Sequence, residues 1–128
     1  MTKRDAILEG MTAKGHYHHG NLREALVDAA RCVIVDEGIA NLSLRKVAKH
    51  AGVSQAAPYH HFDNKDALLV EVAFRGFNEL RSRLASAGAS EAQHGPRLMA
   101  LGAAYVAFGT EHPELYKLMF GRDHCPAE

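Results

Sequence analysis

Histidine is the residue type best suited to chemistry in this 128-residue sequence, because nine histidines occur and imidazole can bind metals or move protons. His16, His18 and His19 lie close together, and His60 and His61 are adjacent. A zinc site needs three or four converging ligands. Adjacent side chains on a helix diverge by roughly 100°, so His60 and His61 are poorly placed to hold one ion. We therefore expect no metal and no cofactor, with a histidine-rich metal sensor as an alternative.

Residues that could catalyse a reaction are not arranged for it. The sequence contains no nucleophile elbow, no phosphate-binding loop and no pair of carboxylates in an apolar setting. Glu111, His112 and Glu114 lie at a predicted helix boundary, where helix capping accounts for them. We expect that the chain is not an enzyme.

A second group of polar side chains lies between Ser43 and Lys65, where four basic residues face one acidic residue. The chain as a whole has a formal net charge of zero, so its total charge favours neither nucleic acid nor membrane as a partner. Residues 1–65 hold nine Lys/Arg against seven Asp/Glu, together with six of the nine histidines. This half becomes more basic when its histidines protonate, which is a weak signal on its own.

Helical spacing predicts the elements that position these residues. Asn21 and Glu24 have the spacing of a capping box, and apolar residues then recur at helical spacing. Gly38 is expected to supply a left-handed stop, so a helix is predicted over 22–37. A second helix begins after Ser43 as N-cap and ends at Gly52. A short third helix follows at about residues 55–61.

Three further helices are predicted beyond this point. Asp63 or Asn64 caps a long fourth helix over 64–87. Pro96 suits the first turn of a fifth helix, and Pro113 opens a short sixth. No segment alternates polar and apolar residues as a strand would, so the predicted fold class is all-α.

The second and third helices have the spacing of a helix-turn-helix unit, with Gly52 in the turn. The five inward positions are all apolar, and Ala48 is small where the two helices cross. Pro58 takes an inward position so early in its helix that its missing N–H costs at most one hydrogen bond. The inward positions are Val47, Ala48, Ala51, Val53 and Pro58, and the outward ones are Arg45, Lys46, Lys49, Gln55, Tyr59 and His60. Spacing alone also allows a plain helical hairpin.

The segment LSLRKVAKHAGVSQAAPYHHFDNKDALL resembles the DNA-binding signature of the TetR/AcrR family of bacterial transcriptional regulators. The shared elements are a Ser-led second helix, the AGVS turn, the tetrad Tyr59-His60-His61-Phe62 and the Lys-acidic-x-Leu-Leu start of the fourth helix. The resemblance covers about residues 20–85. The later segment GAAYVAFGTEHPELYKLMFG resembles early ligand-domain helices of one branch of the family.

This resemblance implies a DNA-contacting surface in which the third helix enters the major groove. Arg45 matches a position that reaches a guanine edge, while Gln55 can pair with adenine and Ala56 can meet a thymine methyl. Ser43 matches a hydroxyl that bonds phosphate while it caps the second helix. The remaining implied contacts are with phosphate at Tyr59, His61 and Lys65, and with base or phosphate at His60.

The resemblance also implies a repressor that binds a palindromic double-stranded operator as a homodimer and releases it when a small-molecule effector binds. We divide the chain into a flexible arm over 1–20, a helix-turn-helix domain over 21–66 and a partial C-terminal regulatory domain over 67–128. The last is truncated relative to the family, which predicts association or marginal stability. Candidate pocket or core residues there are Phe74, Phe77, Met99, Tyr105, Phe108, Tyr116 and Met119.

Composition favours a soluble chain in the cytoplasm that does not enter a membrane. Cys32 and Cys125 are too few for a disulfide framework, and no apolar run reaches the roughly 18 residues of a span. The first twenty residues lack the apolar core of a signal peptide. The segment GHYHHG, with Lys14, either follows phosphate or the minor groove or is plainly disordered. A helical protein-interaction module that keeps the helix-turn-helix as a scaffold is a further alternative.

Overall fold

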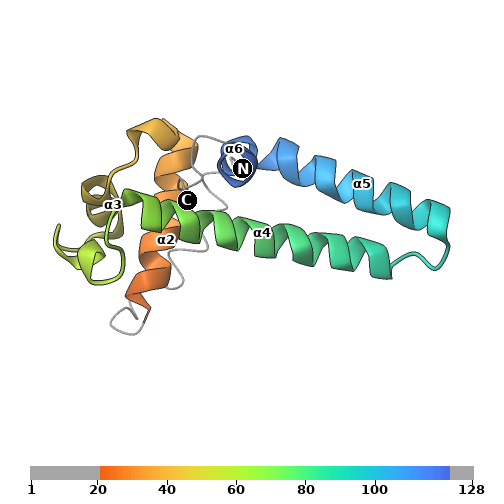
Figure 1. The fold of residues 1–128 in the computed structure, drawn as a ribbon, viewed down its shortest axis with the longest axis horizontal. Helices are drawn as coiled ribbons and strands as arrows, with labels where there is room; N and C mark the ends of the chain where they lie inside the picture. The colour runs from red at the N-terminus through yellow and green to blue at the C-terminus, as the bar shows by residue number, and fades with distance from the viewer. Residues whose placement is uncertain (1–20, 122–128) are drawn as a thin grey trace, which may run out of the picture. The chain divides into compact units, whose positions relative to one another are not determined.

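The structure is a computed structural model that describes residues 21–121. Within this range every regular element is helical, so the all-α prediction is confirmed. Contacts between residues divide the described chain into two units, and the division falls after Val72, inside the long helix over Lys65–Ala89. Each unit is described by itself. The elements in Figure 1 are α2 (Leu22–Glu37), η1 (Ile39–Asn41), α3 (Leu44–Ala51), η2 (Ala57–His60), α4 (Lys65–Ala89), α5 (His94–Glu111) and α6 (Pro113–Phe120).

The core of the first unit forms where α2 and α3 cross. Leu26 on α2 and Val47 and Ala48 on α3 are fully buried, at 0% exposure each. Ala48 is small where a larger side chain would separate the two helices, as the sequence predicts. Phe62, Leu68 and Leu69 cover this core from the segment after η2 and from the first turns of α4, since all three are at most 3% exposed.

Local hydrogen bonds explain where the helices of the first unit begin. The Ser43 hydroxyl accepts a hydrogen bond from the backbone N–H of Lys46 at 3.1 Å, which confirms the predicted cap of α3. At the start of α4 the side-chain carbonyl of Asn64 accepts from the N–H of Ala67 at 2.9 Å. The predicted capping box at Asn21 is wrong, because its side chain makes no cap hydrogen bond.

Two glycines end α2 and α3 in different ways. Gly52 adopts the left-handed conformation (φ 72°, ψ 30°) and its N–H bonds back to the carbonyls of the last turn of α3. Gly38 also has a positive φ of 85°, but its ψ of 162° is extended, so the predicted left-handed stop is wrong. Gly38 instead turns the chain out of α2 and into η1. Glycine suits both positions because other residues rarely adopt a positive φ.

The second unit contains the rest of α4, together with α5 and α6. Figure 1 shows α5 running back beside this part of α4, and α6 following α5 directly. Its core is centred on Phe108, which is fully buried, with Leu115 and Leu118 of α6 at 3% and 4% exposure. Gly76 lets α4 and α6 approach closely, because a Cβ atom there would lie 2.6 Å from the sulfur of Met119.

The limits of these later helices lie close to the predicted ones. Helix α4 extends over Lys65–Ala89, two residues beyond the predicted end, and Pro96 lies in the first turn of α5. Pro113 is the first residue of α6, as proline at a helix start predicts. No helix within residues 21–121 is long and apolar enough to cross a membrane.

Candidate nucleic-acid interface

Helix α3 turns its basic side chains to solvent because its apolar face is buried against α2. Arg45, Lys46 and Lys49 are all exposed. Lys46 forms an ion pair with Glu37 at the end of α2, which ties that side chain to the protein.

The third helix is shorter than predicted and is a 3₁₀ helix, η2, instead of an α-helix over about 55–61. Its turns are closed by hydrogen bonds three residues apart, from the Ala57 N–H to the Ser54 carbonyl at 3.1 Å and from the Tyr59 N–H to the Ala56 carbonyl at 3.2 Å. Pro58 is fully buried, so its inward position is confirmed. Its lack of an N–H removes one bond from this series of short turns.

Burial on one side of η2 leaves the other side open to solvent. Tyr59 is 61% exposed, which is high for an aromatic side chain. Ser43 is half-buried and uses its oxygen as the helix cap, so its hydroxyl hydrogen can still be donated to a phosphate. Lys65, the first residue of α4, is also half-buried. The exposed members of the predicted DNA-contacting group are Arg45, Gln55, Ala56, Tyr59, His60 and His61.

Sequence reasoning missed Arg23, in the first turn of α2. Its guanidinium carbon lies 4.7 Å from the centre of the Phe62 ring. One terminal nitrogen donates to the backbone carbonyl of His61 at 3.0 Å, and the other bonds the Glu71 carboxylate at 3.2 Å. These partners lie 38 and 48 residues further along the chain, so no spacing rule could have found them.

Metal ligands do not gather in the described part of the chain. No group of three His, Cys, Asp or Glu residues between 21 and 121 could hold a metal ion. His61 lies beside the Phe62 ring, with 6.5 Å between the ring centres. Lys14, His16, His18 and His19, which the sequence assigned to the arm, lie outside the described residues.

The candidate pocket residues of the second unit have several different environments. Phe108 and Met119 belong to the core, at 0% and 9% exposure. Phe77, Tyr105 and Tyr116 meet around Phe120, whose ring centre lies 4.7 Å from that of Tyr116. The remaining two candidates, Phe74 and Met99, are 60% and 75% exposed.

Two of these residues share a hydrogen bond. The hydroxyl groups of Tyr105 and Tyr116 lie 2.8 Å apart. This bond raises the pKa of Tyr105 above its ordinary value, because it stabilises the neutral phenol.

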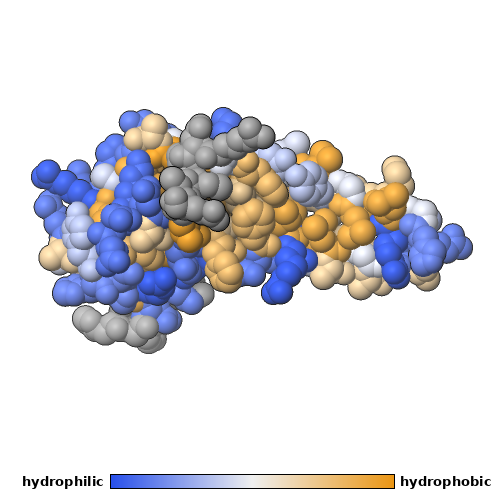
Figure 2. Space-filling view, in the orientation of Figure 1, coloured by the Kyte–Doolittle hydropathy of each residue, from blue (hydrophilic) through white to orange (hydrophobic). Residues whose placement is uncertain are grey.

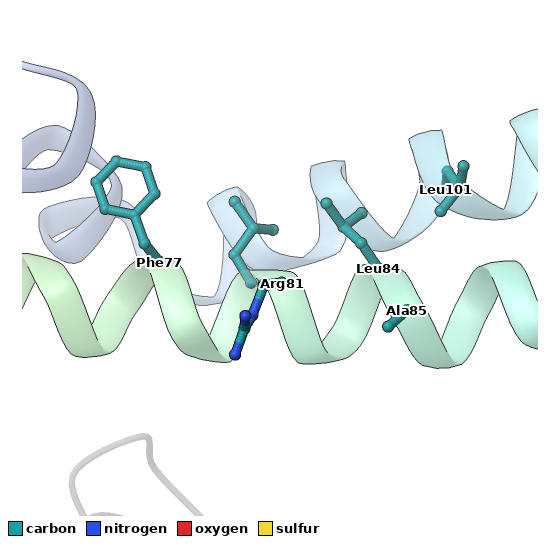
Figure 3. A pocket seen from close by; sticks show the side chains of 6 residues that line it. Phe77, Arg81, Leu84, Ala85 and Leu101 are labelled. Carbon is teal, nitrogen blue, oxygen red and sulfur yellow. The ribbon is translucent and has the colours of Figure 1, made fainter.

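A shallow groove of about 500 Å³ lies between α4 and α5 in the second unit (Figure 3). Phe77 and Leu84 point towards the α5 side, whereas Arg81 points away from it. Of the seven candidate pocket residues, Phe77 alone lines this groove. The lining residues are Phe77, Leu80, Arg81, Leu84, Ala85 and Leu101.

Charged residues near the end of α5 form ion pairs. Arg83 donates to Glu111 at 2.7 Å and to Glu79 at 3.1 Å, and the hydrogen bond with Glu111 raises the pKa of Arg83 above its ordinary value. The His112 ring nitrogen lies 3.4 Å from Arg83. Glu114 pairs with Lys117 within α6. The Arg83 contacts join α4 to the α5–α6 boundary. Ion pairing therefore accounts for Glu111 and Glu114, whereas the start of α6 has no side-chain cap hydrogen bond, so the predicted capping is not found there.

Comparison with known proteins identifies the first unit. Residues 26–72 match the family model described as "Bacterial regulatory proteins, tetR family". The chain is 29% identical over 105 residues to the uncharacterized HTH-type transcriptional regulator YobS of Bacillus subtilis (strain 168), covering 82% of this chain and 54% of that protein. It is 37% identical over 79 residues to the HTH-type transcriptional regulator BetI of Rhizobium meliloti (strain 1021), covering 62% and 39%.

A solved structure extends the likeness into the second unit. A protein of unknown function from Rhodococcus sp. RHA1 is 42% identical, with a TM-score of 0.77 over 88% of this chain and 58% of that chain. The present chain spans about half the length, or less, of the curated relatives it matches. The family model, the relatives and the helix-turn-helix geometry agree, and the chain belongs to the tetR family of bacterial regulatory proteins.

Proposed function

We propose that this chain is a sequence-specific, DNA-binding transcriptional regulator that places η2 in the major groove of double-stranded DNA. The observation that carries the proposal is the two-sided character of α3 and η2. Val47, Ala48 and Pro58 are buried on one side, while hydrogen-bonding side chains are exposed on the other. A rigid apolar support behind an exposed polar surface is what direct reading of base edges requires. Family membership supports the same function.

Base recognition is assigned to three exposed side chains. Arg45 carries a planar guanidinium that can donate two hydrogen bonds to the O6 and N7 atoms of one guanine. Gln55 can bond adenine in the same two-point manner, and Ala56 presents a methyl group to thymine. His60 is the last residue of η2, where its side chain can reach a base or a phosphate.

Contacts with the DNA backbone are assigned to residues around these three. Ser43 can donate its hydroxyl hydrogen, and Lys65 lies at the start of α4, where a cation can approach a phosphate. Tyr59 and His61 are exposed beside them. Such contacts set the register of the protein on the duplex, but they carry no sequence information.

We further propose that the protein is a cytoplasmic repressor that binds a palindromic operator as a homodimer and responds to a small molecule. Two copies would place their η2 segments in successive major grooves, about 34 Å apart. The groove lined by Phe77, Leu84 and Leu101 offers an apolar surface on which such an effector could bind. The names of the relatives, as transcriptional regulators, support regulation of transcription.

Selection of operator sequences from random duplex DNA with the purified chain tests this function. We expect a preferred sequence with two-fold symmetry, and binding that weakens steeply as salt rises, because phosphate contacts release counterions. Binding that ignores both sequence and salt would refute the proposal.

The variant Arg45→Ala tests the assignment of base recognition. It should lower the affinity for the selected operator by roughly 1–3 kcal/mol and relax the preference at one base position. Competition binding with single-base operator variants measures this. An unchanged preference would show that Arg45 does not read a base.

A further inference from the structure

Arg23 occupies a position that connects three parts of the first unit. It starts on α2, crosses the face of Phe62, reaches the backbone just after η2 and ends at Glu71 on α4. We propose that Arg23 is a positioning residue that holds the C-terminal end of η2 in the orientation needed to bind DNA. This inference rests on the proposed DNA-binding function and adds a residue to it.

The chemistry of arginine fits this position closely. Its planar guanidinium can stack on an aromatic ring and donate hydrogen bonds in two directions at once. Here it lies over Phe62, which is 2% exposed and therefore a fixed surface. A lysine at the same place would keep the positive charge, but it could not make both in-plane hydrogen bonds and the ring contact together.

The contact with His61 explains how Arg23 can act on η2. The N–H groups of His61 and Phe62 both bond the carbonyl of Pro58, at 3.0 and 2.9 Å. The same two residues also contact Arg23, through the His61 carbonyl and the Phe62 ring. The chain after η2 is therefore held both by a short turn to Pro58 and by a side chain of α2.

Without Arg23, this end of η2 depends on weak local bonds. A 3₁₀ helix has poorer hydrogen-bond geometry than an α-helix, and η2 contains four residues. The backbone that carries Tyr59 and His61 would then become more mobile, although the two side chains themselves are unchanged. The expected result is a loss of operator affinity that does not come from losing a phosphate contact.

A direct contact between Arg23 and phosphate is the competing explanation, because its side chain is 47% exposed. The two explanations differ in salt dependence. Removing a phosphate contact weakens binding to all sequences and lowers the salt slope by about one. Removing a positioning contact weakens the well-fitted operator most and leaves the salt slope unchanged.

The experiment compares Arg23→Gln and Arg23→Lys with wild type and with Arg97→Gln. Arg97 is a matched control, because it also lies in the first turn of a helix and donates to a backbone carbonyl, that of Glu91, at 3.1 Å. Binding to the selected operator and to random duplex is measured over a range of salt concentrations. Amide hydrogen exchange at His61 and Phe62 is measured without DNA.

We expect Arg23→Gln to lower operator affinity roughly tenfold, since a charge-assisted hydrogen bond and a ring contact are lost. Affinity for random duplex and the salt slope should stay the same, and exchange at His61 and Phe62 should become faster. Arg23→Lys should give an operator affinity and exchange rates between those of Arg23→Gln and wild type. Arg97→Gln should match wild type in both. If Arg23→Gln fails to fold, Arg23→Lys decides the question through the same measurements.

Two results would overturn the inference. Equal losses on operator and random duplex, with a salt slope lower by about one, would make Arg23 a phosphate contact. Unchanged exchange at His61 and Phe62 would show that Arg23 does not hold this backbone. Failure of the wild-type chain to bind any duplex would instead refute the proposed function, and the exchange measurement separates the two because it needs no DNA.

Discussion

The two units use the same helical spacing of apolar residues with different results. In the first unit these residues meet in a closed core around Leu26 and Val47, and the surface seen in Figure 2 is largely hydrophilic. In the second unit apolar surface is visible along α4 and α5 in the same figure. The exposed apolar side chains of the second unit are Phe74, Phe77, Leu98, Met99, Tyr105, Val106 and Phe120.

This difference shows what apolar periodicity can and cannot predict. Periodicity identifies which side of a helix is apolar, but burial needs a second surface to cover that side. In the first unit α2, α3 and the start of α4 cover one another. In the second unit α5 places Leu98 and Met99 in solvent, at 71% and 75% exposure. Exposed apolar patches of this kind commonly mark interaction surfaces.

Truncating one leucine in each unit tests the comparison with the largest expected effect. Leu26→Ala should lower the free energy of unfolding by about 2–5 kcal/mol, because Leu26 is fully buried and its loss leaves a cavity. Leu98→Ala should change it by less than about 0.5 kcal/mol, because Leu98 already contacts solvent. Urea denaturation followed by circular dichroism measures both. A comparable loss for Leu98→Ala would show that the exposed face of α5 is covered in solution.

Replacing a glycine in each unit should give effects of opposite sign. Gly52→Ala should destabilise by roughly 1 kcal/mol, because φ is 72° there and a Cβ atom disfavours it. Gly102→Ala should stabilise by roughly 0.5–1 kcal/mol, because Gly102 lies inside α5 and nothing lies within 4 Å of an added Cβ. Thermal melting of the two variants checks this. Two changes of the same sign would contradict the contrast between a turn and a helix interior.

The smallest expected effect is a pH dependence confined to the second unit. The hydrogen bond with Tyr116 raises the pKa of Tyr105, so the folded protein holds this proton more tightly than the unfolded chain does. The contribution to stability is therefore complete below the ordinary tyrosine pKa of about 10 and is lost as the pH rises through the raised value. As the pH rises from about 10 through the raised pKa, the urea concentration at the unfolding midpoint should fall less for Tyr105→Phe than for wild type. Identical pH profiles would show that the bond contributes nothing.

Much of the fold could be predicted from the sequence because its signals are local. The limits of α2, the Ser43 cap and the end of α3 at Gly52 depend on neighbouring residues, and all agree with the structure. The kind of helix at η2 could not be predicted in this way. Pro58 in η2 and Phe62 just after it are both buried, and such burial depends on tertiary packing that local spacing does not specify.

In the candidate site, too, local signals could be read from the sequence and contacts between distant residues could not. Exposure of Arg45, Gln55 and Tyr59 followed from their place between buried positions, and their roles on DNA stay predictions. Arg23 could not be found, because its role depends on partners from distant parts of the chain. Met99 could not be distinguished from a core residue, because burial depends on which helices face one another.

The buried proline of η2 has a consequence for how DNA preference can change. Pro58 holds the turn from its inner side, so the outward residues contribute little to stability. A gene library that randomises Gln55, Ala56, Tyr59 and His60 while keeping Pro58 should therefore yield mostly folded proteins with diverse operator preferences. Divergence of recognition among descendants of such a sequence needs no change in the fold that presents it.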